Sequence, residues 1–120
     1  MTGPISRVVL VTGGSRGIGR ATAELLAGRG HKVAVNYVSN ATAAADAVAA
    51  IDAAGGTAIA VQGDVGEEAA VERIVDEVQD QLGQIEILVN NAGITRDDLI
   101  MWMKPEAWDD VLQTNLRSVY

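Results

Sequence analysis

The stretch that decides the fold is Val8-Val9-Leu10-Val11, followed directly by Thr12-Gly13-Gly14-Ser15-Arg16-Gly17-Ile18-Gly19. The first four residues are an uninterrupted β-branched and aliphatic run, which is typical of a strand buried on both faces. The glycines that follow permit a tight turn and a close approach of the backbone to a phosphate group. A loop of this kind between a strand and a helix predicts a nucleotide phosphate site, with a plain tight turn as the alternative. No Gly-Lys-Ser/Thr follows, which disfavours a P-loop nucleoside triphosphatase.

The chain on either side of this loop alternates between strand and helix patterns. A helix is expected up to about Gly28, with Ile18, Ala21 and Leu25 on its buried face. Three more strands are predicted at Val33–Val35, Ala58–Val61 and Ile85–Val89. Two helices are predicted between these strands. The first is capped by Asn40 or Thr42, ends at Gly55-Gly56 and carries apolar residues at helical spacing, Ala44, Val48 and Ile51. The second has a clearer apolar stripe, made of Val71, Ile74, Val75, Val78 and Leu82.

Beyond the fourth strand, we expect a polar loop over residues 90–98. Apolar loop residues, Trp102 among them, should then lead to a last helix that starts near Pro105 and is packed through Trp108. The whole pattern predicts an α/β fold with right-handed crossovers and a parallel sheet that is covered by helices on both faces.

Composition narrows the classes of function. The chain has 120 residues, which fits one domain or part of one, and its 48% hydrophobic and 21% charged residues are typical of globular proteins. The absence of cysteine excludes disulfides, thiolate metal sites and a cysteine nucleophile from these residues, and we predict no metal site. A net charge of −7 disfavours nucleic-acid binding and attraction to anionic membranes. No secretory signal or membrane-spanning run is evident, so a cytoplasmic protein is the expectation.

Four motifs in order resemble the short-chain dehydrogenase/reductase family. The glycine spacing 13, 17, 19 is similar to that family's Thr-Gly-x-x-x-Gly-x-Gly. Asp64-Val65 matches its pair near the adenine ring, Asn90-Asn91-Ala92-Gly93 its sheet-bracing motif, and Asn115 the asparagine of its catalytic tetrad. Because Arg16 stands where extended family members have glycine, the resemblance is to the single-domain subgroup. It implies a doubly wound Rossmann-type sheet in the strand order 3-2-1-4, with helices on both faces. In that order the strand at Ile85–Val89 would be an edge of the sheet, which is unusual for so apolar a strand.

The residues between the motifs narrow the resemblance. The stretches at 93–99 and 103–108, and Thr114-Asn115-Leu116, look like the bacterial 3-oxoacyl-[acyl-carrier-protein] reductases. That resemblance implies reduction of a 3-oxoacyl thioester carried by acyl-carrier-protein or CoA, as in fatty acid synthesis. Acetoacetyl-CoA reductases and polyketide ketoreductases share much of the same sequence in these stretches and remain alternatives. Family members are commonly tetramers, so a homo-oligomer is implied as well.

The end of the second strand predicts NADP(H) and not NAD(H). An NAD site usually holds the ribose 2′-hydroxyl with Asp or Glu, whereas this strand ends in Asn36-Tyr37-Val38-Ser39-Asn40, without an acid. Arg16 can meet a 2′-phosphate with its forked guanidinium, and Ser39 and Asn40 can add neutral hydrogen bonds.

The resemblance assigns the remaining cofactor contacts residue by residue. Gly13, Gly17 and Gly19 would shape the pyrophosphate site, Asp64 and Val65 would face the adenine, and Asn91 would begin the nicotinamide side. The predicted cofactor set is completed by Thr12, Ser15, Ile18, Asn36, Ala92, Gly93 and Ile94.

The family's reaction is hydride transfer between a nicotinamide and a carbonyl, and it implies a Tyr acid, a Lys that lowers the pKa of that Tyr, a Ser and an Asn. A tyrosine ordinarily titrates near about 10, so it needs the cation to work at neutral pH. Only Asn115, which would hold a relay water, is present, since neither Tyr37 nor Tyr120 begins a Tyr-x-x-x-Lys motif. We therefore expect residues 1–120 to be the NADP-binding N-terminal part of a longer domain, which is inactive alone and associates or aggregates. The rival hypothesis is a non-catalytic nucleotide-binding chain that needs a partner polypeptide.

Overall fold

A computed structural model describes residues 6–14 and 17–91, and the backbone of residues 99–102. In chain order its elements are β1 (Val8–Thr12), α1 (Gly17–Gly28), β2 (Lys32–Tyr37), α2 (Ala41–Ala53), β3 (Thr57–Gln62), α3 (Glu68–Gln81), β4 (Ile87–Asn90) and β5 (Leu99–Trp102). The last helix, expected near Pro105, and Trp108 lie outside the described residues. Within them, no helix is long and apolar enough to cross a membrane.

The strands form one sheet in the order β3-β2-β1-β4-β5. The pairs β2–β3, β1–β2 and β1–β4 are all parallel, which confirms the predicted order 3-2-1-4. All five residues of β1 are buried, as expected for the central strand of a sheet covered on both faces.

The fifth strand corrects the expectation that residues around Trp102 form a loop and that the fourth strand is an edge. The backbone of Leu99–Trp102 pairs antiparallel with β4, so β4 lies between β1 and β5. An uninterrupted apolar run of four residues has no periodicity that distinguishes a strand from an apolar loop, which is why the sequence did not reveal it.

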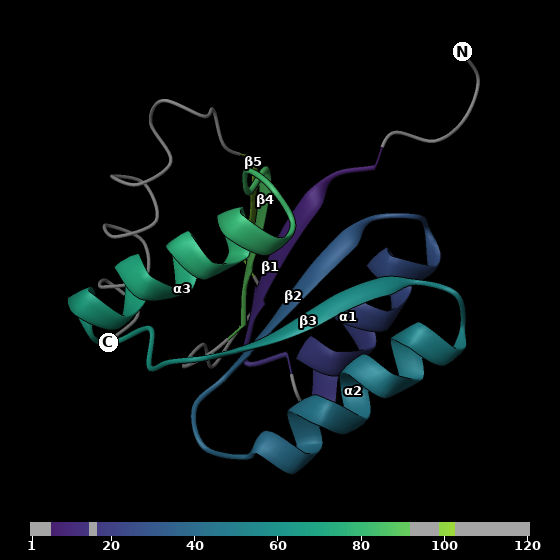
Figure 1. Ribbon diagram of the computed structural model, residues 1–120, viewed down its shortest axis with the longest axis horizontal. Coiled ribbons are helices and arrows are strands. Elements are labelled where there is room, and N and C mark those ends of the chain that lie inside the picture. Colours follow the sequence, from purple (N-terminus) through teal and green to yellow (C-terminus); the bar gives the residue numbers. More distant parts are fainter. Residues whose placement is uncertain (1–5, 15–16, 92–98, 103–120) are drawn as a thin grey trace.

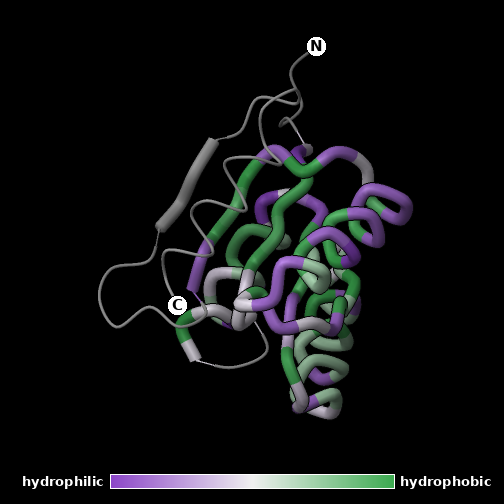
Figure 2. The backbone as a smooth tube through the Cα atoms, turned by 90° about the vertical axis from the view of Figure 1, so that its left-hand side faces the viewer, coloured by the Kyte–Doolittle hydropathy of each residue, from purple (hydrophilic) through white to green (hydrophobic). Residues whose placement is uncertain are grey.

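The helices cover opposite faces of the sheet. Figure 1 shows α3 on one face and α1 and α2 on the other. Two apolar clusters match this division: one joins α3 residues such as Ile74 and Val78 to the sheet, and the other joins α1 and α2 through Ala23, Ala27 and Ile51. Figure 2 shows mostly hydrophobic residues along the strands, and hydrophobic and hydrophilic residues alternating along the helices. The predicted layers are therefore confirmed.

The α1 helix presents a different face to the sheet from the one predicted. Its buried residues are Gly19, Ala23 and Ala27, whereas Ile18 is 68% and Leu25 is 56% exposed. The spacing of four between the buried residues forms a narrow stripe of small side chains, which lets the helix backbone approach the sheet closely. A face chosen by side-chain hydrophobicity alone was wrong because close approach, and not apolar bulk, decides this contact.

The other helix boundaries follow local chemistry. Asn40, and not Thr42, caps α2, with its Oδ1 accepting a hydrogen bond from the Ala43 N–H at 3.0 Å. Gly55 and Gly83, with φ of 89° and 113°, follow the ends of α2 and α3 as expected. In α3 the buried stripe is Val71, Ile74, Val75 and Val78, while Leu82 is the C-cap residue and is partly buried.

Candidate functional site

The candidate site lies along the carboxyl ends of β1, β2, β3 and β4. The chain leaves β1 towards β2 on one side and returns to β4 on the other, so the helices that follow β1 and β3 lie on opposite faces. In doubly wound sheets such a reversal opens a crevice outside the strand ends, where ligands bind. The glycine loop begins at this point, directly after β1.

The described part of the glycine loop is held in a turn that only glycine adopts readily. Gly13 and Gly17 have φ of 64° and 60°, in the left-handed region. The N–H of Gly14 donates to the Asn36 carbonyl at 3.1 Å, which ties the loop to the end of β2. Apart from its chain neighbours and the backbone of α1 itself, no described residue lies within 4 Å of the position that a Cβ on Gly17 would take. Among the described residues, the start of α1 is therefore open to an approaching group.

Thr12, at the end of β1, is hydrogen-bonded to the end of β4. Its hydroxyl is buried, donates to Asn90 Oδ1 at 3.1 Å and accepts the Asn91 N–H at 2.8 Å. The Asn91 side chain then donates through Nδ2 to the Gly13 carbonyl at 3.3 Å. The end of β4 and the glycine loop are therefore linked through two residues of the predicted set. Among the described residues, buried Asn90 Nδ2 finds no hydrogen-bond partner.

Gly19 makes this junction possible. A Cβ at that position would overlap the Gly13 carbonyl oxygen and would lie 2.7 Å from Asn91 Nδ2. The first turn of α1 therefore packs directly on the loop, and the Asn91 amide occupies the space beside it. The third glycine of the motif is a packing requirement, as the sequence pattern implies.

At the end of β2, two of the residues predicted to contact the cofactor, Asn36 and Asn40, already make hydrogen bonds within the chain. The buried amide of Asn36 donates to the Val61 and Gly63 carbonyls, at 3.2 and 3.0 Å, and so braces β2 against β3. Asn40 uses its Oδ1 as the α2 cap and keeps its Nδ2 protons for other partners. Ser39 is exposed. No acid stands among these residues to repel a phosphate.

At the end of β3, Asp64 and Val65 occupy different environments. Asp64 Oδ1 accepts a hydrogen bond from the Gly66 N–H at 2.8 Å, which forms a local turn. The second carboxylate oxygen of Asp64 takes no part in this bond. The Val65 side chain is only 2% exposed and belongs to the α3-side core cluster. Any contact of Val65 with a bound base must therefore come from its backbone.

Several predicted site residues lie outside the described residues: Ser15, Arg16, Ala92, Gly93, Ile94 and Asn115. Of the others, the structure brings Thr12, Gly13, Gly19 and Asn91 into one network, and it leaves Ile18 exposed beside the loop. Gln62 was missed by the sequence reading: its Nε2 donates to the Val38 carbonyl at 3.0 Å. A glutamine at a strand end carries no sequence signal for such a contact.

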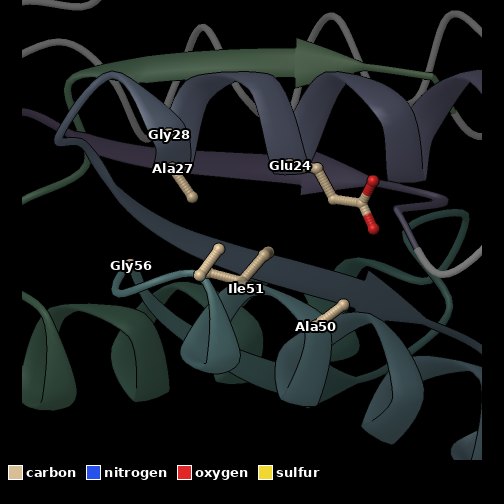
Figure 3. Close-up of a pocket in the computed structure, with 7 residues that line it drawn as sticks. Glu24, Ala27, Gly28, Ala50, Ile51 and Gly56 are labelled. Atoms are coloured by element: carbon tan, nitrogen blue, oxygen red, sulfur yellow. The ribbon is translucent and has the colours of Figure 1, made fainter.

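A groove elsewhere on the molecule lacks comparable chemistry. It has a volume of about 250 Å³ and lies between α1 and α2, where Ala27 and Ile51 approach each other (Figure 3). Its only charged lining residue, Glu24, is paired with Arg20 at 2.9 Å. Nor do the described residues contain a group of three or more His, Asp or Glu side chains placed to hold a metal ion. The carboxyl edge of the sheet remains the candidate site.

Comparison with known proteins gives the same picture. The sequence model of the family described as short chain dehydrogenase matches residues 7–120. The chain belongs to the short-chain dehydrogenase family. As a member of that family it has the expected fold: a short chain dehydrogenase from Burkholderia cenocepacia, solved in complex with NADP, superimposes with a TM-score of 0.71 and 40% identity. That match covers 94% of this chain and 49% of the other.

Curated members of the short-chain dehydrogenase family are more similar in sequence. The 3-oxoacyl-[acyl-carrier-protein] reductase of Synechocystis is 50% identical over 120 residues, which is all of this chain and 49% of the relative. The enzyme of the same name from Staphylococcus aureus is 47% identical over 116 residues, or 97% of this chain and 47% of the relative. The chain thus spans about half the length of these relatives.

Proposed function

We propose that these residues are the cofactor-binding part of an NADPH-dependent reductase that converts a 3-oxoacyl thioester to the 3-hydroxyacyl thioester. The observation that carries the proposal is the 50% identity, over all 120 residues, to a 3-oxoacyl-[acyl-carrier-protein] reductase. Acyl-carrier-protein is accordingly the proposed carrier of the substrate, with CoA thioesters as the alternative. A homo-oligomer, as in other members of the family, is part of this proposal.

The geometry of the described residues fits a dinucleotide. The backbone at Gly13 and Gly17 and the open first turn of α1 offer N–H groups to a pyrophosphate. The Asp64 carboxylate and the Val65 backbone are available to the polar edge of an adenine. Asn91 to Ile94 would lie on the nicotinamide side. When bound, NADPH supplies the hydride, and the residues of this chain orient it and exclude water from it.

NADPH is preferred over NADH in this proposal because the end of β2 carries no acid. The strand ends in Asn36 and Tyr37, and the connection to α2 offers Ser39 and the free Nδ2 of Asn40 as neutral donors. Arg16 would supply the positive charge that a 2′-phosphate requires. A relative of known structure was solved with NADP, in agreement with this assignment.

The cofactor assignment is tested by replacing Arg16 with Ala and titrating the chain with NADPH and with NADH. Loss of one charge-assisted phosphate contact should weaken NADPH binding by about 10-fold or more and leave NADH binding nearly unchanged. Arg29→Ala, at an exposed position beyond the end of α1, is the control and should change neither affinity. Equal losses for the two dinucleotides would remove the phosphate role of Arg16.

The substrate assignment is tested on the longer protein that contains these residues. NADPH oxidation is followed with acetoacetyl-acyl-carrier-protein and with acetoacetyl-CoA at matched concentrations. A higher kcat/KM for the carrier protein supports the proposal, and a preference for CoA favours the acetoacetyl-CoA reductase alternative. Binding of NADPH without turnover of either thioester would favour the non-catalytic alternative.

A further inference from the structure

The short connection between β2 and α2, Val38 to Asn40, carries the neutral groups that face the proposed 2′-phosphate. Each end of this connection is anchored. On the sheet side, the Gly63 N–H donates to the Tyr37 carbonyl at 2.9 Å, and on the helix side the Ala43 N–H donates to Asn40 Oδ1 at 3.0 Å. The Ala41 N–H also donates to the Ser39 carbonyl at 3.1 Å, which ties Ser39 to the start of α2. None of these bonds links the connection to the sheet beyond Tyr37.

Burial does not fix the path of this connection either. The Val38 side chain is 55% exposed, although it is apolar, and Ser39 is exposed as well. A segment with so little buried apolar area depends on hydrogen bonds for its position. Among the described residues, the bond that links this segment to the sheet comes from the Gln62 side chain, whose Nε2 donates to the carbonyl of Val38, the first residue of the segment, at 3.0 Å.

Gln62 is well placed for this task. It is the last residue of β3 and lies opposite Tyr37 in the parallel register. Its side chain therefore continues the β2–β3 ladder by one residue, past the point where the backbone bonds stop. Gln62 is exposed and is not a core residue, so packing does not account for this contact.

We propose that Gln62 is a positioning residue for the adenosine end of NADPH. Through the Val38 carbonyl it fixes the Val38–Asn40 backbone, and with it the Ser39 hydroxyl and the Asn40 Nδ2. This inference rests on the proposed function. Its physical basis is that neutral donors recognise a phosphate only within hydrogen-bond distance, so a displacement of about 1 Å removes much of their contribution.

The experiment replaces Gln62 with Met, which keeps the length of the side chain and removes the donor. Gln81→Met is the matched control, because Gln81 is also an exposed glutamine and its Nε2 contacts only Glu77 on the same helix in the described structure, at 3.5 Å. The chain is titrated with NADPH, NADH and adenosine 2′,5′-bisphosphate. For Gln62→Met we expect affinity for NADPH and the bisphosphate to fall by about 3- to 10-fold, and affinity for NADH by less than about 2-fold. Gln81→Met should change none of the three.

The ratio of NADPH to NADH affinity separates positioning from general stability. A merely structural role for Gln62 would lower both affinities alike, or neither, and either result would overturn the inference. If the unchanged chain binds neither dinucleotide, the cofactor assignment itself fails and the inference fails with it. If the unchanged chain binds NADPH and Gln62→Met keeps the same ratio, the inference alone fails.

Discussion

The absence of a single Cβ at Gly19 brings the glycine loop and the end of β4 together. An alanine there would overlap the Gly13 carbonyl oxygen and lie 2.7 Å from the Asn91 amide nitrogen, so the loop, the helix or the asparagine must move. We expect Gly19→Ala to destabilise the chain by about 1–3 kcal/mol, as overpacking does. NADPH affinity should also fall, by about 10-fold or more, because phosphate binding depends on loop geometry.

Gly28, at the other end of the same helix, is the control for this substitution. A Cβ there has no atom within 4 Å, and alanine is the better helix former. Gly28→Ala should leave NADPH affinity unchanged and make the chain equally or more stable, by up to about 1 kcal/mol. Urea unfolding and fluorescence titration measure both variants, and equal behaviour of the two alanines would contradict the packing role of Gly19.

Individual residues show how far a motif can be read. The sequence predicted Thr12, Gly19 and Asn91 as members of the site, and the structure joins the threonine and the asparagine by a 2.8 Å hydrogen bond. The sequence did not reveal that the Asn36 side-chain amide donates hydrogen bonds to the Val61 and Gly63 carbonyls. Such bonds join residues about 25 positions apart in the chain, and no local pattern encodes them. A motif therefore predicts where a residue lies, but not which of its groups are free.

The α1 helix shows which properties of a whole helix the sequence predicts and which it does not. Its type and approximate limits were predictable from the loop before it and the glycines after it, whereas its rotation about its own axis was not. The loop junction at Gly19 sets that rotation, and the same stripe continues through Ala23 and Ala27. Ile18 and Leu25, the larger apolar residues, are left mostly exposed. Hydrophobic periodicity fails where a helix must approach a sheet closely enough to place its N-terminus over a ligand.

Two substitutions in α1 distinguish the observed rotation from the one that hydrophobicity predicted. Ala23 is fully buried against the sheet, so Ala23→Leu should destabilise the 120-residue chain by about 1–3 kcal/mol or more. Leu25 is 56% exposed, so Leu25→Ala should cost less than about 1 kcal/mol. Urea unfolding of both variants gives the comparison. The reverse order, with Leu25→Ala the more damaging, would support the predicted face and contradict the observed one.

For the molecule as a whole, strand order was the most predictable property. Four apolar strands separated by helices predict a parallel sheet with right-handed crossovers, and the family resemblance adds the order β3-β2-β1-β4 that the structure shows. The pairing of β5 with β4 was not predictable, because a run of four apolar residues carries no periodic signal that marks it as a strand. That pairing removes the argument that an open β4 edge would make the chain aggregate. The expectation that these residues alone are inactive depends instead on which catalytic side chains they contain.

Binding and turnover should therefore separate in this chain. The glycine loop, the start of α1 and the strand ends are the elements proposed to hold the dinucleotide, so the 120-residue chain is expected to bind NADPH. These 120 residues contain no complete Tyr-x-x-x-Lys motif, since Ala41 stands four residues after Tyr37, and we therefore assign the proton-donating tyrosine and its lysine to residues outside them. With saturating NADPH and an acetoacetyl thioester, we expect no loss of NADPH absorbance above the rate without protein.

Gly19→Ala is the control for binding, since it should lower the NADPH titration signal and leave the turnover assay at its baseline. Enzyme-dependent oxidation of NADPH by the unmodified 120 residues would show that another group donates the proton, and it would overturn the assignment of that step to residues outside this chain.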